Sequence, residues 1–136
     1  MRKEICDFFN FNEERIEELK QIEFRVIDSF EETEHEYKTE VREIELANFV
    51  GSVRYDFSSP MNLYDAYKKL HKGYLYINKS ISDWEDIVTN PRDGVLPQVV
   101  MINGEYYHWG EGKHRLITSK ILGFNKIKVS VLIIKV

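Results

Sequence analysis

Residues 110–115, Gly-Glu-Gly-Lys-His-Arg, have the composition of a phosphate-binding turn. Glycines such as Gly110 and Gly112 permit unusual backbone angles and the close approach of a ligand. The free N–H groups of a helix that begins after such a turn attract anions. Lys113, His114 and Arg115 would fall in the first turn of that helix, where the helix dipole disfavours cations. A bound anion would offset this placement, so the segment predicts a phosphate site.

The same residues also have a purely structural interpretation. Lys113 or Arg115 would then pair with Glu111, with Glu105 or with an acid of the N-terminal half, as surface ion pairs do. Gly112 would only shape a tight turn. The residue types and their spacing leave both interpretations open.

Histidine spacing gives no indication of a metal site. His35, His71 and His108 lie in unrelated contexts without the spacing of zinc ligands, so we expect no zinc. His114 has two interpretations. It is an acid or base that acts beside a phosphate, or it is a structural histidine whose ring nitrogens are hydrogen-bonded.

The elements that must position the turn are a hairpin, a helix and a strand. Asn103-Gly104 separates two β-rich runs, residues 99–102 and 105–109, and is the strongest short-range signature of a hairpin. Residues 113–122 are predicted to form a helix that ends at the following glycine. Residues 127–136 are a β-branched run typical of a buried strand.

The front of the chain predicts further helices and a pair of strands. Asn12 followed by acids predicts an N-capped helix. Alternating residues at 24–26 and 37–41 predict a hairpin-like pair of strands. Apolar residues at 63, 67 and 70 predict a helix that stops near Gly73. Residues 82–86 are predicted to be a capped turn or short helix and residues 90–94 a loop.

Length and composition favour one folded unit. The chain has 136 residues, 43% of them hydrophobic, which suffices for one core. The single cysteine has no partner for a disulfide or a thiolate metal site. No apolar run of about 18 residues and no signal-like N-terminus occurs, so we expect no membrane association and a cytoplasmic location.

Charge is distributed unevenly along the chain. Residues 1–46 hold 15 of the 23 acidic residues and 7 of the 19 basic ones, which leaves 8 acids and 12 bases in residues 47–136. The acidic front argues against general nucleic-acid binding there, whereas the mildly basic remainder suits a phosphate-bearing partner. The charges are equally consistent with an ordinary solvated surface.

Residues 96–131, LPQVVMINGEYYHWGEGKHRLITSKILGFNKIKVSV, resemble the core of the ParB/sulfiredoxin superfamily. That family carries a strand pair, a Gly-(Asp/Glu)-Gly-x-His-Arg type of turn, a helix ending Leu-Gly and an Ile-x-Val-x-Val strand. Residues 41–46 and 53–55 resemble its opening strand and the arginine that follows, here Arg54. The resemblance implies an α+β fold with a small mixed sheet and helices over residues 41–136. Residues 1–40 would then be an acidic N-terminal extension, a helix plus a hairpin-like strand.

The branches of the family imply different activities. Sulfiredoxins use a cysteine immediately before the His-Arg pair, where this chain has Lys113, so we do not expect sulfiredoxin chemistry. ParB proteins bind CTP and read DNA with a helical domain that follows, and because this sequence stops at Val136 we do not expect that DNA-reading domain. The Asp-Gly-His-His-Arg motif of ADP-dependent free serine kinases matches residues 111–115 with two substitutions.

The resemblance implies roles for particular residues. Gly110, Gly112, Lys113, His114, Arg115 and Arg54 would bind the phosphates of ATP, ADP or CTP, with Mg²⁺ held by phosphate oxygens. In a kinase or NTPase, a carboxylate would orient the nucleophile, and the candidates are Glu111 and Asp56. Arg54 and Asp56 are equally consistent with a surface ion pair.

Three functions follow as expectations. The first is a nucleotide-binding domain with phosphoryl transfer or NTP hydrolysis. The second is a ParB-like module associated with DNA, although no stripe of basic and aromatic residues supports it. The third is a non-catalytic regulatory protein of the same fold, whose residues 1–40 bind a protein partner or form a homodimer.

Overall fold

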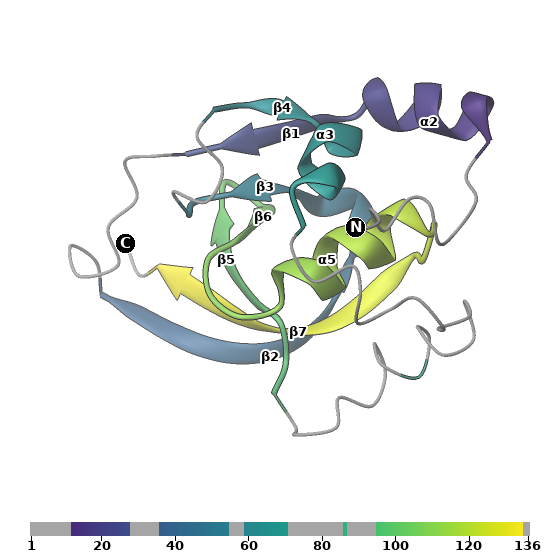
Figure 1. Ribbon diagram of the computed structural model, residues 1–136. Coiled ribbons are helices and arrows are strands. Elements are labelled where there is room, and N and C mark those ends of the chain that lie inside the picture. Colours follow the sequence, from purple (N-terminus) through teal and green to yellow (C-terminus); the bar gives the residue numbers. More distant parts are fainter. Residues whose placement is uncertain (1–11, 28–35, 55–58, 71–85, 87–94, 135–136) are drawn as a thin grey trace.

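The computed structural model describes residues 12–27, 36–54, 59–70, 86 and 95–134 (Figure 1). In chain order the elements are α2 (Glu13–Lys20), β1 (Glu23–Val26), β2 (Tyr37–Glu45), the 3-10 helix η2 (Leu46–Asn48), β3 (Phe49–Ser52), β4 (Met61–Asn62), α3 (Leu63–Lys68), β5 (Gln98–Ile102), β6 (Glu105–His108), α5 (Lys113–Ile121) and β7 (Lys126–Ile134). These residues form an α+β fold with a mixed seven-stranded sheet and three α-helices. The expected fold class is confirmed at this level.

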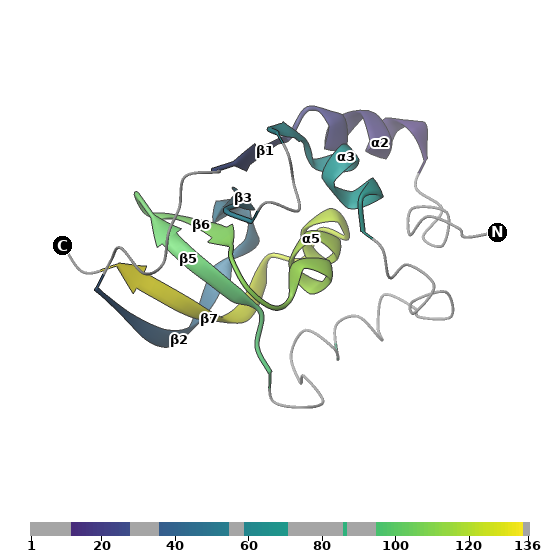
Figure 2. The same ribbon diagram turned by 60° about the vertical axis from the view of Figure 1, so that its left-hand side comes forward.

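The sheet has the strand order β2-β7-β5-β6-β3-β1-β4. β2 and β7 are antiparallel, as are β5 and β6, and β1 and β4. The pairs β5–β7, β3–β6 and β1–β3 are parallel. The helices gather on one side of this sheet, and α5 lies between α3 and the strands (Figure 2).

The expected elements from residue 99 onward are confirmed. β5 and β6 form the hairpin, and Asn103 and Gly104 at its tip have φ angles of 53° and 78°, the positive values that a type I′ turn requires. α5 is followed by Gly123 with a φ of 84°. β7 covers most of the predicted last strand.

The N-terminal helix is also confirmed, and the structure supplies its cause. The Asn12 side chain accepts a hydrogen bond from the Arg15 backbone N–H at 2.8 Å, which satisfies one of the free donors of α2. Glu13 and Glu14 lie in the first turn, where negative charge is favourable.

The expected hairpin-like pairing of residues 24–26 with residues 37–41 is wrong. β1 pairs with β3 and β4, whereas β2 pairs with β7 over nine consecutive positions. The nine-residue register offers β2 far more backbone hydrogen bonds than the four-residue β1 does, and it sets Ile44 opposite Ile127 in the core. β2 therefore pairs with β7, which is distant in the sequence, and not with the nearer β1.

The helix expected to stop near Gly73 ends earlier. α3 ends at Lys68 and is capped by Lys69, and Gly73 itself lies outside the described residues. The segments expected at residues 82–86 and 90–94 also lie outside them, apart from Asp86.

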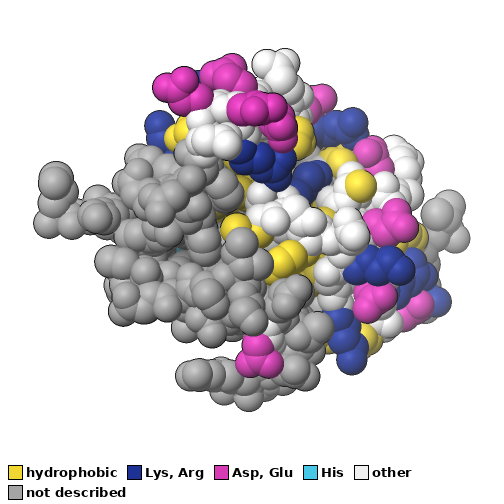
Figure 3. All heavy atoms as spheres, turned by 90° about the vertical axis from the view of Figure 1, so that its right-hand side faces the viewer, with side chains coloured by type: hydrophobic (Ala, Val, Ile, Leu, Met, Phe, Trp, Pro, Cys, Tyr) yellow, Lys and Arg dark blue, Asp and Glu magenta, His cyan; other side chains and the backbone are white. Residues whose placement is uncertain are grey.

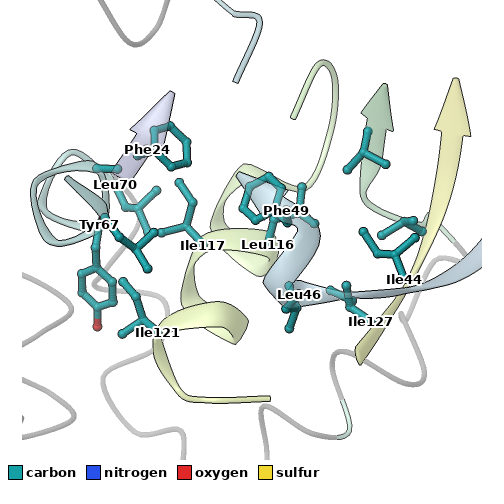
Figure 4. Close-up of a cluster of buried hydrophobic side chains, with 14 of the residues drawn as sticks. Phe24, Ile44, Leu46, Phe49, Tyr67, Leu70, Leu116, Ile117, Ile121 and Ile127 are labelled. Carbon is teal, nitrogen blue, oxygen red and sulfur yellow. The ribbon is translucent and has the colours of Figure 1, made fainter. Parts of the chain in front are cut away.

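One large core lies between the helices and the sheet (Figure 4). Leu19 of α2 and Phe24 of β1 are buried in the same cluster as Leu116 of α5 and Ile127 of β7. The Phe24 ring meets the Phe49 ring edge to face, with centroids 6.2 Å apart. Residues 12–27 therefore share the core of the segments that follow residue 41. A smaller cluster around Val100 and Leu132 covers the other face of the sheet.

Candidate functional site

The parallel pair β3–β6 brings two of the predicted site segments to the same edge of the sheet. Ser52, the last residue of β3, is in register with His108, the last residue of β6. The Val53 backbone N–H donates to the His108 carbonyl at 2.9 Å and extends the pairing beyond both strands. Arg54, which is exposed, and Gly110 both follow directly at this edge.

The start of β5 closes the turn from a third side. The Gln98 backbone N–H donates to the Glu111 carbonyl at 2.8 Å, and the Gln98 side-chain oxygen accepts from the Glu111 N–H at 2.8 Å. A Cβ added at Gly110 would lie 2.1 Å from that side-chain oxygen. Gly110 therefore leaves room for the Gln98 side chain, a contact within the protein itself.

Gly112 is the N-cap of α5 and adopts a left-handed conformation with a φ of 95°. A Cβ there would lie 2.5 Å from both Cα and Cβ of Pro97. The Gly112 carbonyl accepts the first hydrogen bond of the helix from the Leu116 N–H at 2.9 Å. Having no side chain, Gly112 supplies no capping hydrogen bond to the first turn. The glycine is thus explained by backbone geometry and by packing against Pro97.

A buried hydrogen-bond chain ties β3 to this turn. His108 Nε2 lies 2.6 Å from the Gly110 carbonyl, and Nδ1 lies 3.0 Å from Ser52 Oγ. A carbonyl can only accept, so Nε2 carries the proton. The single proton of the Ser52 hydroxyl has two acceptors within reach, Nδ1 of the neutral ring and the His108 carbonyl at 3.3 Å. The Arg54 N–H donates in turn to Ser52 Oγ at 3.1 Å.

The Ser52–His108 pair resembles a nucleophile and base in its geometry but not in its exposure. Ser52 is 0% and His108 2% exposed, so a substrate cannot reach the hydroxyl. The pair instead fixes the Gly110 carbonyl relative to the backbone of Arg54. Sequence reasoning missed Ser52, Pro97 and Gln98, because their role depends on strand pairing between distant segments.

The three side chains that begin α5 are each half-buried. Arg115 Nη1 donates to the Val95 carbonyl at 2.6 Å, which anchors the side chain to the segment before β5. Lys113 and His114 occupy the first two positions of the helix. Glu105, one of the acids considered as their partners, instead pairs with Arg25 at 2.7 Å.

Glu111 is exposed on the turn between the two glycines. Asp56, the other expected carboxylate, lies outside the described residues. Among the residues with described positions, no group of three His, Cys, Asp or Glu side chains could hold a metal ion. None of the described helices is long and apolar enough to cross a membrane.

No protein-family model matches the chain, and neither a curated protein nor a solved structure is similar to it.

Proposed function

We propose that the chain binds the phosphate groups of a nucleotide, ATP, ADP or CTP, at residues 110–115, in a fold of the ParB/sulfiredoxin type. The observation that carries the proposal is the convergence of Arg54 and the N-terminus of α5 at the carboxyl ends of the parallel strands β3 and β6. Ligands of sheets with parallel strands bind beyond the carboxyl ends of those strands, where loops and helix N-termini meet.

The electrostatics of this corner favour an anion. The first turn of α5 has backbone donors and the positive end of the helix dipole, and Gly112 offers it no side-chain oxygen. Lys113, His114 and Arg115 add cationic or titratable groups at the same place. Phosphate oxygens are the acceptors that such an arrangement binds best.

The order of elements also supports the resemblance stated for the sequence. The hairpin β5–β6, the glycine turn, α5 and β7 follow one another as in the ParB/sulfiredoxin core. Gln98 and Pro97 hold the turn in one shape before any ligand arrives, and a rigid site loses less entropy on binding.

Phosphoryl transfer extends the proposal to a reaction. Phosphate oxygens would carry Mg²⁺, and a carboxylate would orient the attacking hydroxyl or water. Glu111 is the carboxylate on the turn itself, and Asp56 follows Arg54 by two residues. His114 would then donate a hydrogen bond to a phosphoryl oxygen.

Isothermal titration calorimetry with ATP, ADP and CTP, each with Mg²⁺, tests the proposal. We expect saturable binding, and we expect Arg54→Ala to weaken it by roughly 10- to 150-fold, because a charge-assisted hydrogen bond contributes about 1.5–3 kcal/mol. Arg42→Ala removes an arginine from the distant strand β2 and is the matched control. No binding at millimolar nucleotide would contradict the proposal.

Product analysis after incubation with a bound nucleotide separates an enzyme from a regulatory protein. Release of phosphate, or its transfer to an added hydroxyl acceptor such as serine, would support phosphoryl transfer. Binding without turnover would make the chain a regulatory nucleotide-binding protein.

A further inference from the structure

A second site candidate lies at the opposite end of α5 from the glycine turn. A surface pocket of 490 Å³ opens between η2, the end of α5 and the start of β7, and its volume is in the range of small-molecule sites. Apolar side chains of Ile22, Leu46 and Phe124 form part of its wall. Figure 3 looks onto this side of the molecule, with the acidic side chains of α2 at the top and basic side chains below them.

Lys120 of α5 lines this pocket and points toward the core side of the helix. It follows Leu116 by four residues and Ile117 by three, and both are 0% exposed, so the three share one face of α5. Lys120 Nζ donates to the Phe49 carbonyl. It also lies 5.9 Å from the centre of the Phe49 ring.

The Lys120 amine is partly buried, and the described residues give it no carboxylate partner. None of the ion pairs between described residues includes it. Burial lowers the pKa of Lys120 to about 8, and the distant charge of Glu105 only partly opposes this. Near pH 8 about half of the Lys120 amines are therefore neutral, compared with well under 1% for an amine of ordinary pKa.

We propose that this pocket is a covalent binding site for a small carbonyl compound, an aldehyde or an oxo acid, and that the Lys120 amine forms an imine with it. A neutral amine keeps one N–H for the Phe49 carbonyl and has a lone pair for attack. Desolvation of an amine in a partly apolar pocket is a known means of making lysine nucleophilic.

The reaction needs no oxidant or reductant. The amine nitrogen attacks the carbonyl carbon, and a proton passes from nitrogen to oxygen to give a carbinolamine. The carbon–oxygen bond then breaks, the hydroxyl takes the second proton of the nitrogen and leaves as water, and a carbon–nitrogen double bond forms. For an oxo acid, the Asn125 amide and the Lys126 ammonium line the same pocket and suit its carboxylate.

Two other charged side chains line the pocket around the Lys120 amine. Glu45 and Lys126 line it from β2 and β7 and stand opposite each other in the register of these strands. Lys126 also forms an ion pair with Glu43 at 3.9 Å, and burial is the dominant influence on the pKa of Lys120.

Reductive trapping on the full chain tests the site. The protein is incubated with glyoxylate and sodium cyanoborohydride near neutral pH, and peptide mass spectrometry measures the labelling rate of each lysine. We expect Lys120 to be labelled about tenfold faster than Lys126, although Lys126 is more exposed, because burial lowers the pKa of the Lys120 amine and makes it a better nucleophile. Lys120→Met should abolish this fast label, and Lys126→Met should retain it.

The competing explanation is that Lys120 only binds the Phe49 carbonyl. Burial alone would then make Lys120 slower than Lys126, and a Lys120 rate equal to or below the Lys126 rate overturns the proposal. The wild-type map gives this answer even where Lys120→Met fails to fold. Acetaldehyde in place of glyoxylate identifies the ligand class: faster labelling by glyoxylate indicates an oxo acid, and similar rates indicate an uncharged aldehyde. The test does not depend on nucleotide binding.

Discussion

The two ends of α5 are both marked by a glycine with positive φ, yet their surroundings differ. Gly112 at the start has a φ of 95° and would bring a Cβ within 2.5 Å of Pro97. Gly123 after the end has a φ of 84°, and a Cβ there would meet nothing within 4 Å. The first end is a fixed turn packed against β5, and the second is an open corner beside a pocket. The same backbone conformation therefore serves packing at one end and only chain reversal at the other.

The largest expected loss of stability comes from replacing these two glycines with alanine. Gly112→Ala should lower the free energy of unfolding by about 3–5 kcal/mol, because it combines left-handed strain with overpacking against backbone atoms of Pro97. Gly123→Ala should cost about 1 kcal/mol, since only the conformational strain applies. Urea unfolding of both variants measures the two values.

Equal losses in the two variants would contradict the comparison. Gly104→Ala is a further control, because Gly104 also has positive φ and open space around it. It should behave like Gly123→Ala.

A smaller effect is expected at Gly110. A Cβ there meets mainly the side chain of Gln98, which can move, so Gly110→Ala should cost about 1–2 kcal/mol through the lost hydrogen bond to the Glu111 N–H. In a Gln98→Ala background the same substitution should cost much less, because the obstructing atoms are gone. A double-mutant cycle by urea unfolding gives this coupling, and additive losses would show that Gln98 does not shape the turn.

The last prediction concerns the other end of the helix and is a pH dependence of stability. The folded pKa of Lys120 is about 8, below the ordinary 10.5, so the unfolded chain binds more protons between these values and stability rises with pH there. Relative to Lys120→Met, the wild type should gain stability as pH increases from about 8 toward 10.5. Chemical unfolding of both proteins across this range measures the difference. A flat or falling difference would contradict the burial of the amine.

Local signals in the sequence predicted the second half of the fold well. Asn103-Gly104 specifies a turn through its own backbone preferences, and the glycine at position 123 ends a helix in the same way. Asn12 likewise caps its own helix. Such features depend on neighbouring residues, and a single chain displays them directly.

Pairing between distant segments could not be predicted in the same way. The partner of β2 is β7, about ninety residues later in the chain, and the wrong hairpin came from preferring the nearer strand. The link between Ser52 and His108 depends on the parallel pair β3–β6, for which no local pattern exists. Glycines 110 and 112 predicted a turn correctly, but their contacts with Gln98 and Pro97 depend on that same long-range arrangement.

The unusual position of Lys120 could have been recognised from the sequence. Its spacing from Leu116 and Ile117 puts it on the apolar face of the predicted helix. A lysine at such a position either extends its ammonium to solvent or is held in a partly buried pocket. Only the carbonyl of Phe49, supplied by β3, decides between the two.

The most direct measurement of the central claim is a nucleotide titration followed by amide chemical shifts in NMR spectra. Saturable shifts should concentrate on the amides of residues 111–115 and on Arg54, while Gly123 and Phe124 at the other end of α5 stay unchanged. Absence of saturable shifts at millimolar ATP, ADP and CTP with Mg²⁺ would contradict the claim. Shifts that concentrate around the Lys120 pocket would contradict it equally.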